Sequence, residues 1–135
     1  MDDELEQYRK PQTGSISNAS QPLSGSRISD TGRLDFAIER DYDPVAQLMG
    51  MEIEGIDIAV LFPTAGLNWI ARDGLDPKLS LAICQAYNNW IHDFCKHSPD
   101  RMKFAAMLPV HDVNLACQEL VRCVTDLGAV GSFIH

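Results

Sequence analysis

The spacing of hydrophobic residues alternates between two patterns from about residue 41 onward. Apolar residues recur at helical spacing in three segments, at about 44–54, 78–96 and 112–128. Three shorter segments, at about 56–62, 102–108 and 129–134, are nearly continuous apolar runs, which are typical of strands buried on both faces of a parallel sheet. The predicted order is helix then strand, three times over. One helix in each connection predicts parallel strands with right-handed crossovers.

The ends of the predicted helices carry their own signals. Asp-Pro pairs at 43–44 and 76–77 place an N-cap residue before a proline at the first helical position. Asp112 is the expected N-cap of the third helix, and Gly55 and Gly128 are expected stops. The residues of the third helix that we expect to face inward are Leu115, Ala116, Leu120, Val121 and Val124.

Residues 1–40 differ in composition from the rest of the chain. The stretch from Pro11 to Gly32 is rich in Ser, Gly, Asn, Gln and Pro and has few large apolar residues. Such a stretch buries too little surface to offset its conformational entropy. We therefore predict a polar loop or disordered segment at 1–40 and a domain at 41–135. The segment could be a linker or a loop that covers the substrate of a larger enzyme.

Charge and composition exclude several kinds of partner. The chain has 11 Lys and Arg against 19 Asp and Glu, a net charge of −8, so it lacks the basic patch that nucleic acid or an anionic membrane surface requires. It has no run of about 18 apolar residues, and its N-terminus is acidic and polar, unlike a secretory signal. The four cysteines form no CxxC pair, which fits reduced thiols in a cytoplasmic protein.

Two fold classes fit this alternation of helices and strands. They are a TIM barrel and an open, doubly wound sheet. The loop after the first strand contains neither GxGxxG nor GxxxxGK[ST], so a dinucleotide site or a P-loop is unsupported. An open, flavodoxin-like binding domain is disfavoured for the same reason, because it needs a loop that cradles a phosphate.

Three stretches together resemble the amidohydrolase-related family, in its branch that is similar to aminocarboxymuconate-semialdehyde decarboxylase. They are RDYDPVAQLMGMEIEGIDIAVLFPTAG at 40–66, AYNNWIHDFCKHSPDRMKFAAMLPVHD at 86–112 and LGAVGSFIH at 127–135. The resemblance covers about residues 39–135, and it depends on the order and spacing of all three stretches, because no single motif is diagnostic.

The resemblance implies an α/β fold that is part of a metal-dependent (β/α)8 TIM barrel. It also implies a hydrolase or decarboxylase of a small carboxylated, often aromatic, substrate, with zinc or manganese as the divalent metal. The three predicted strands would be the second, third and fourth of the barrel, whereas the family's metal ligands follow other strands. We therefore expect a fragment that contains no catalytic residue and no metal ligand, binds no metal by itself and is inactive alone.

Five residues are candidates for lining a substrate pocket, because they follow strands at the face where a barrel places its chemistry. Thr64 follows the first strand, and Asn68 and Trp69 lie in the loop after it. His111 follows the second strand, and His135 ends the third. An ordinary structural role in a loop or turn is the alternative for each of them.

A non-enzymatic function is the rival hypothesis for the whole chain. A half barrel leaves two strand edges unpaired, and such edges favour association with other chains. The chain would then be an α/β module that closes its sheet by forming a homo-oligomer.

Overall fold

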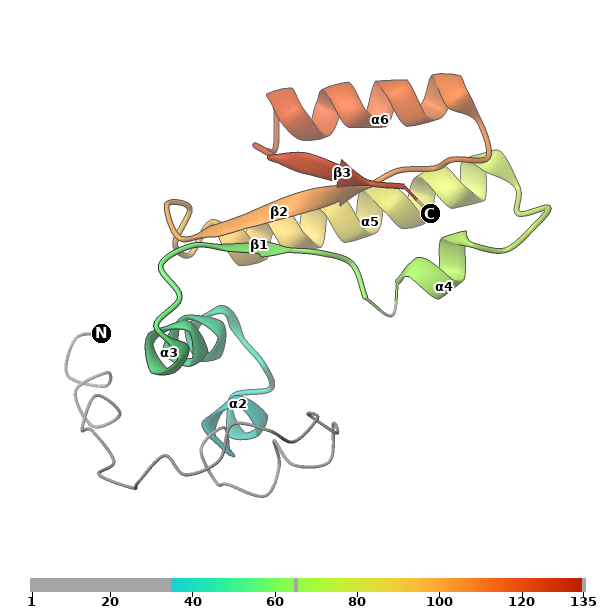
Figure 1. The fold of residues 1–135 in the computed structure, drawn as a ribbon. Coiled ribbons are helices and arrows are strands. Elements are labelled where there is room, and N and C mark those ends of the chain that lie inside the picture. The colour runs from blue at the N-terminus through green and yellow to red at the C-terminus, as the bar shows by residue number, and fades with distance from the viewer. Residues whose placement is uncertain (1–34, 65, 135) are drawn as a thin grey trace, which may run out of the picture. The chain divides into compact units, whose positions relative to one another are not determined.

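A computed structural model describes residues 35–64 and 66–134 of the chain (Figure 1). Residues 1–34 of the predicted polar segment lie outside the described residues. The predicted domain boundary after residue 40 stays a prediction. The chain forms two compact units, Met1–Asp57 and Ile58–His135, and each is described by itself.

In the first unit, two helices follow each other: α2 (Asp35–Glu39) and α3 (Pro44–Glu54). The Asp43 carboxylate accepts a hydrogen bond from the backbone N–H of Ala46 at 2.7 Å, which confirms the predicted N-cap. Gly55 ends α3 in the left-handed region, with a φ of 70°. Phe36, Ala46 and Met49 form the small apolar core of this unit. The five-residue helix α2 was not predicted.

The second unit contains a parallel sheet of three strands, which confirms the predicted α/β class. The strands are β1 (Ala59–Leu61), β2 (Met102–Met107) and β3 (Gly131–Phe133), in the order β1-β2-β3. β1 pairs with the first half of β2, from Met102 to Phe104, and β3 pairs with its second half, from Ala105 to Met107. Among the described residues, β1 and β3 each have a single neighbouring strand.

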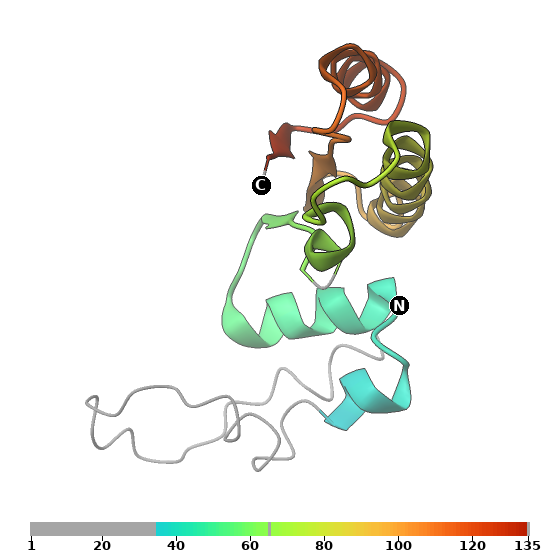
Figure 2. The ribbon, with the colours of Figure 1, turned by 90° about the vertical axis from the view of Figure 1, so that its right-hand side faces the viewer.

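Helices α5 (Pro77–Cys95) and α6 (Val113–Thr125) lie on the same side of this sheet (Figure 2). The carboxylate of Asp76 accepts from the N–H groups of Lys78 and Leu79, and that of Asp112 accepts from Leu115, all at 3.0 Å. Both residues therefore cap their helices as predicted. A short helix, α4 (Leu67–Ile70), lies in the loop after β1 and was not predicted. No helix in the described part of the chain is long and apolar enough to cross a membrane.

Burial differs from the prediction on α6 and on both outer strands. Val121 and Val124 of α6 are 61% and 50% exposed, whereas Glu119, two residues before Val121, is only 2% exposed, so the inward direction predicted for the two valines was wrong. α6 has this orientation because the Glu119 carboxylate accepts hydrogen bonds from Gln85 and Asn88 of α5. Neither β1 nor β3 is buried on both faces as predicted: Val60 of β1 is 44% exposed and Val130, just before β3, is 56% exposed, because both are edge strands in the described part of the sheet.

Candidate functional site

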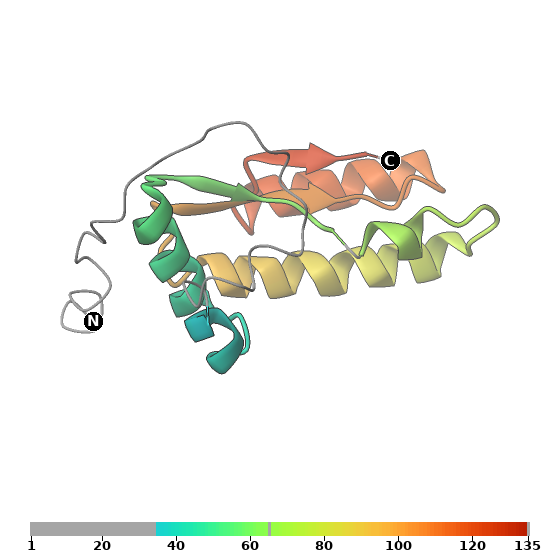
Figure 3. The ribbon, with the colours of Figure 1, turned by 60° about the horizontal axis from the view of Figure 1, so that its bottom comes forward.

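The carboxyl ends of the three strands meet at one edge of the sheet, since all three are parallel (Figures 1 and 3). The predicted site residues follow these ends. Thr64 is exposed in the loop after β1, and Asn68 is exposed on α4, which also carries Trp69. His135 lies outside the described residues. The structure thus places Thr64, Asn68 and Trp69 in the segment that leaves β1, where a role in substrate binding stays a prediction.

His111 follows β2, and both of its ring nitrogens have partners within the chain. Nε2 lies 2.9 Å from the backbone oxygen of Arg72, and Nδ1 lies 3.2 Å from Oγ of Ser80. Since a carbonyl oxygen only accepts, Nε2 carries a proton and donates to Arg72, and Nδ1 forms a hydrogen bond with the Ser80 hydroxyl. The ring therefore ties the loop after β2 to the first turns of α5 and to the loop that precedes α5. In this arrangement neither nitrogen is free for a substrate.

The loop after β1 closes over the end of β2 through apolar contacts. Ile70 of α4, Cys84 of α5 and Met107 of β2 form a buried cluster. Gly66 lies directly above it, since a Cβ at this position would be 3.7 Å from the Met107 sulfur. These contacts place the segment that carries Asn68 and Trp69 next to the end of β2.

A polar contact holds the same end of β2 to α5. The Asn88 side chain donates to the backbone oxygen of Met107 at 2.9 Å and accepts from the Met107 N–H at 2.8 Å. β1 pairs with β2 only as far as Phe104, whose carbonyl accepts from Val130 on the β3 side. The backbone N–H and C=O groups of successive residues in a strand point to opposite edges. Met107 comes three residues after Phe104, so its N–H and C=O groups point to the β1 side. Asn88 thus makes the two bonds that β1 would make if it continued.

The Asn88 amide also donates to the buried Glu119 carboxylate at 2.8 Å. Arg122 binds both oxygens of this carboxylate, at 2.7 and 2.9 Å, and Gln85 of α5 donates to it at 3.3 Å. Burial by itself raises the pKa of Glu119, but the hydrogen bonds from Arg122 and Asn88 lower it further than burial raises it. Glu119 is therefore a buried carboxylate that stays charged.

The sulfur of Cys123 donates to the same carboxylate at 3.3 Å. Burial, with this hydrogen bond to Glu119, raises the pKa of Cys123 to about 12, and burial raises that of Cys84 to about 12. Both thiols are therefore poor nucleophiles at neutral pH. The sequence analysis did not predict this network. The signal that could have indicated it is that Glu119 and Arg122, three residues apart, are the two charged residues of α6.

No group of three His, Cys, Asp or Glu in residues 35–64 and 66–134 could hold a metal ion. The described residues therefore do not fit the ligand set that a metal-dependent enzyme requires.

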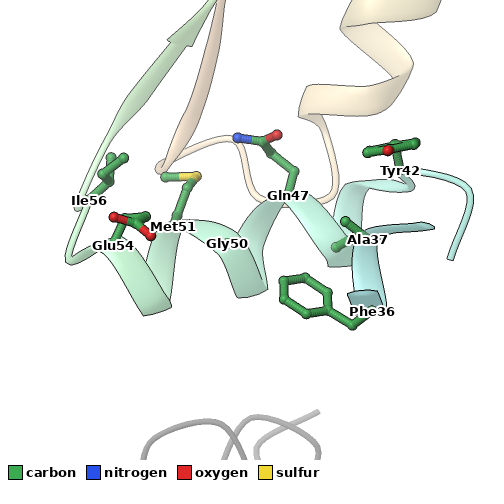
Figure 4. Close-up of a pocket in the computed structure, with 9 residues that line it drawn as sticks. Phe36, Ala37, Tyr42, Gln47, Gly50, Met51, Glu54 and Ile56 are labelled. Carbon is green, nitrogen blue, oxygen red and sulfur yellow. The ribbon is translucent and has the colours of Figure 1, made fainter. Parts of the chain in front are cut away.

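The first unit contains a surface pocket of about 290 Å³, and none of the predicted site residues lines it (Figure 4). Its lining is mainly apolar, with Gln47 and Glu54 as its amide and carboxylate groups. Tyr42 reaches this pocket from a turn in which Asp41 and Tyr42 have φ values of 51° and 54°, which are unusual for residues other than glycine. A bidentate bond between Arg40 and Asp43, at 3.0 and 3.2 Å, closes this turn.

The architecture is that of α/β proteins with parallel strands, and its structural neighbours are TIM-barrel decarboxylases. One is the crystal structure of 2,6-dihydroxybenzoate decarboxylase complexed with 2,6-dihydroxybenzoate, with a TM-score of 0.60, 32% identity, and coverage of 66% of this chain and 26% of that one. Another is dihydroxybenzoic acid decarboxylase from Polaromonas sp. JS666 with bound manganese and the inhibitor 2-nitroresorcinol, with a TM-score of 0.60, 27% identity, and coverage of 66% and 26%.

Sequence relatives lead to the same enzymes. The chain is 36% identical over 86 residues to gamma-resorcylate decarboxylase of Rhizobium radiobacter, which is 63% of this chain and 25% of the relative. It is 38% identical over 56 residues to gamma-resorcylate decarboxylase of Rhodococcus jostii (strain RHA1), which is 42% of this chain and 17% of the relative. No family model matches the chain.

The homologues of this chain are thus metal-dependent decarboxylases of small aromatic carboxylates, which confirms the resemblance found in the sequence. The chain spans a quarter or less of the length of the curated relatives that it matches.

Proposed function

We propose that this chain forms one segment of a metal-dependent decarboxylase that acts on a small aromatic carboxylate of the dihydroxybenzoate type. The observation that carries the proposal is the joint likeness to these enzymes, 36% identity in sequence and a TM-score of 0.60 in structure. Decarboxylation is favoured over hydrolysis because the relatives and neighbours named above are all decarboxylases.

The segment would contribute pocket wall at the edge where its strands end. Thr64, Asn68, Trp69 and His135 are the proposed substrate contacts, and His111 would hold the neighbouring loop through Arg72 and Ser80. Loss of CO₂ leaves an electron pair on the ring carbon, which must then take up a proton. We assign metal binding to none of the described residues, because no group of three possible ligands occurs among them, and we assign no residue to the proton transfer.

A chimeric enzyme tests this proposal. Residues 40–135 would replace the matching segment of the Rhizobium radiobacter gamma-resorcylate decarboxylase, and release of CO₂ from 2,6-dihydroxybenzoate would be measured with manganese present. We expect activity from the chimera and none from the 135-residue chain alone. A folded, manganese-loaded chimera without decarboxylase activity would contradict the proposal. A second chimera with Thr64→Val and Asn68→Ala should keep its fold and metal content and have a higher KM.

A non-enzymatic α/β module is the second candidate, favoured by the sheet edges. β1 and β3 each have one strand neighbour among the described residues, and Val60 and Ile134 near them are 44% and 67% exposed. A stable oligomer that melts cooperatively and is broken by charges on these strands would support the module. For either candidate we propose a cytoplasmic location and neither nucleic acid nor membrane as partner, supported by four free cysteines and the net charge of −8.

A further inference from the structure

Helix α5 carries a row of three buried residues that contact the segments leaving β1 and β2. Ser80, Cys84 and Asn88 are spaced by four residues, so they lie along one side of the helix, and all three are 0% exposed. We call these three residues the α5 row. Because a buried polar side chain needs hydrogen-bond partners, the partners of Ser80 and Asn88 indicate what the row does.

The row binds the segment after β2 at both of its ends. We call residues 108–111, which follow β2, the β2 loop. Asn88 bonds to both backbone groups of Met107, directly before the loop, at 2.8 and 2.9 Å. Ser80 bonds to the ring of His111, the last residue of the loop, at 3.2 Å. The β2 loop is therefore fixed to a single helix where it begins and where it ends.

The same row holds the segment that leaves β1. Cys84 belongs to the buried apolar cluster that includes Ile70 of α4. The ring of His111, while bonded to the row, also donates to the backbone oxygen of Arg72 at 2.9 Å, in the loop between α4 and α5. The segments that leave β1 and β2 are thus both attached to α5, and through it to each other.

The Asn88 amide has a single favourable orientation in this arrangement. Its NH2 group donates to the Glu119 carboxylate at 2.8 Å and to the carbonyl oxygen of Met107, and both of these partners only accept. A flipped amide would place its oxygen against two acceptors. The buried carboxylate of α6 therefore fixes the orientation in which Asn88 pairs with the end of β2.

We propose that the α5 row positions the wall of the substrate pocket: Ser80 and Asn88 hold the β2 loop and the segment after β1 in one fixed arrangement before substrate binds. Both are positioning residues, because they act through His111 and Met107. The substrate in this inference rests on the proposed function, in which Asn68 and Trp69 of the segment after β1 contact an aromatic carboxylate. A wall that is already ordered spares binding the entropy cost of ordering it, so a loosened wall raises KM.

Amide hydrogen exchange of the 135-residue chain, followed by NMR, tests the anchors without any reaction. The reporters are the amides of Val110 and Asp112, whose hydrogen-bond partners at 3.0 and 3.3 Å are carbonyl oxygens of the β2 loop itself. The reference is the amide of Val130, which donates to β2 within the sheet at 3.1 Å. A fixed loop predicts protected reporters in the wild type, and unprotected reporters there would overturn the proposal.

Ser80→Ala is the main variant, because it removes one oxygen atom and leaves the fold intact. We expect it to speed exchange at Val110 and Asp112 about fivefold or more relative to Val130, since loss of a buried hydrogen bond favours local opening by about that ratio. The matched control is Ile91→Val on the same helix, where the isoleucine is 3% exposed, and it should change the three amides alike. If Ser80→Ala leaves the reporters unchanged, or speeds all three amides equally, the row does not position the loop.

The chimera with gamma-resorcylate decarboxylase extends the test to the reaction. Ser80→Ala in the chimera should raise KM for 2,6-dihydroxybenzoate severalfold and leave kcat and manganese content unchanged, whereas Ile91→Val should change neither kinetic constant. Loss of manganese, or a KM equal to that of the parent chimera, would overturn the positioning role. An inactive parent chimera would contradict the proposed function instead, and the exchange rates would still decide whether the α5 row fixes the β2 loop.

Discussion

Asn88 and Met107, which are 19 residues apart, exchange two hydrogen bonds in the way that residues of neighbouring strands do. The side chain of a helix thus continues the pairing of β2 past the end of β1. The same amide binds Glu119, so one side chain joins β2, α5 and α6. Because all of these groups are buried, removal of one leaves its partners without water to replace it.

Asn88→Ala should therefore destabilise the fold strongly. The N–H and C=O of Met107 would lose their partners, which we expect to cost about 2–4 kcal/mol in the free energy of unfolding. Urea denaturation followed by circular dichroism measures this cost. Its neighbour provides the control: Asn89 is exposed and accepts one bond from Arg122, so Asn89→Ala should cost less than about 1 kcal/mol. Equal costs for the two variants would contradict the proposed pairing.

The Glu119 carboxylate should make the stability depend on pH. Its pKa in the folded chain lies below the usual value of 4.5, so its contribution is present above that pH and is lost as the pH falls through the folded pKa. The hydrogen bond from the Arg40 guanidinium likewise lowers the pKa of Asp43, so Glu119 is not the sole carboxylate that makes the stability of the wild type fall in acid. Glu119→Gln should therefore be less stable than the wild type at pH 7, and the difference should shrink in acid. A difference in urea midpoint that is constant from pH 7 to pH 3 would contradict this assignment.

Thiol reactivity should separate the four cysteines. Burial raises the pKa of Cys84, Cys95 and Cys123 to about 12, 11 and 12 and also shields them from reagents. With Ellman's reagent at pH 8 we expect one fast thiol per native chain, Cys117, and four in denaturant. Cys117→Ser should remove the fast reaction, and a second fast thiol in the native wild type would show that one of the buried three is accessible.

His111 should protect the loop before α5 from proteolysis. Its ring binds the backbone oxygen of Arg72, a residue after which trypsin cleaves. His111→Ala should therefore increase the rate of tryptic cleavage after Arg72 severalfold, as measured by mass spectrometry of early digests. The control is His97→Ala, because His97 is exposed and lies just past α5. If both variants are cut at the rate of the wild type, the His111 contacts do not hold this loop.

The features that the sequence predicted well are local ones. Asp43, Asp76 and Asp112 each cap the helix that follows within three residues, so short motifs were sufficient to place α3, α5 and α6. Helices α2 and α4 have only five and four residues, too few to show a helical period. The alternation of predicted helices and strands indicated parallel strands, and the family motifs at 39–135 then favoured the TIM barrel over an open sheet.

The features that the sequence did not predict depend on partners far along the chain. Glu119 is buried because Gln85 and Asn88, 34 and 31 residues earlier, bind it, and this contact rotates Val121 and Val124 into solvent. His111 likewise binds Arg72 and Ser80, 39 and 31 residues away. Hydrophobic periodicity contains no information about such pairs.

The pairing of β2 has a consequence for the geometry of a longer sheet. β1 begins opposite Met102, whereas β3 begins opposite Ala105, three residues further along the same strand. The sheet is therefore sheared from its first strand to its third, and shear is the property that lets tilted strands close into a barrel. A further parallel strand added beside β3 with the same offset would start further along again, so these three strands already set the direction of the tilt.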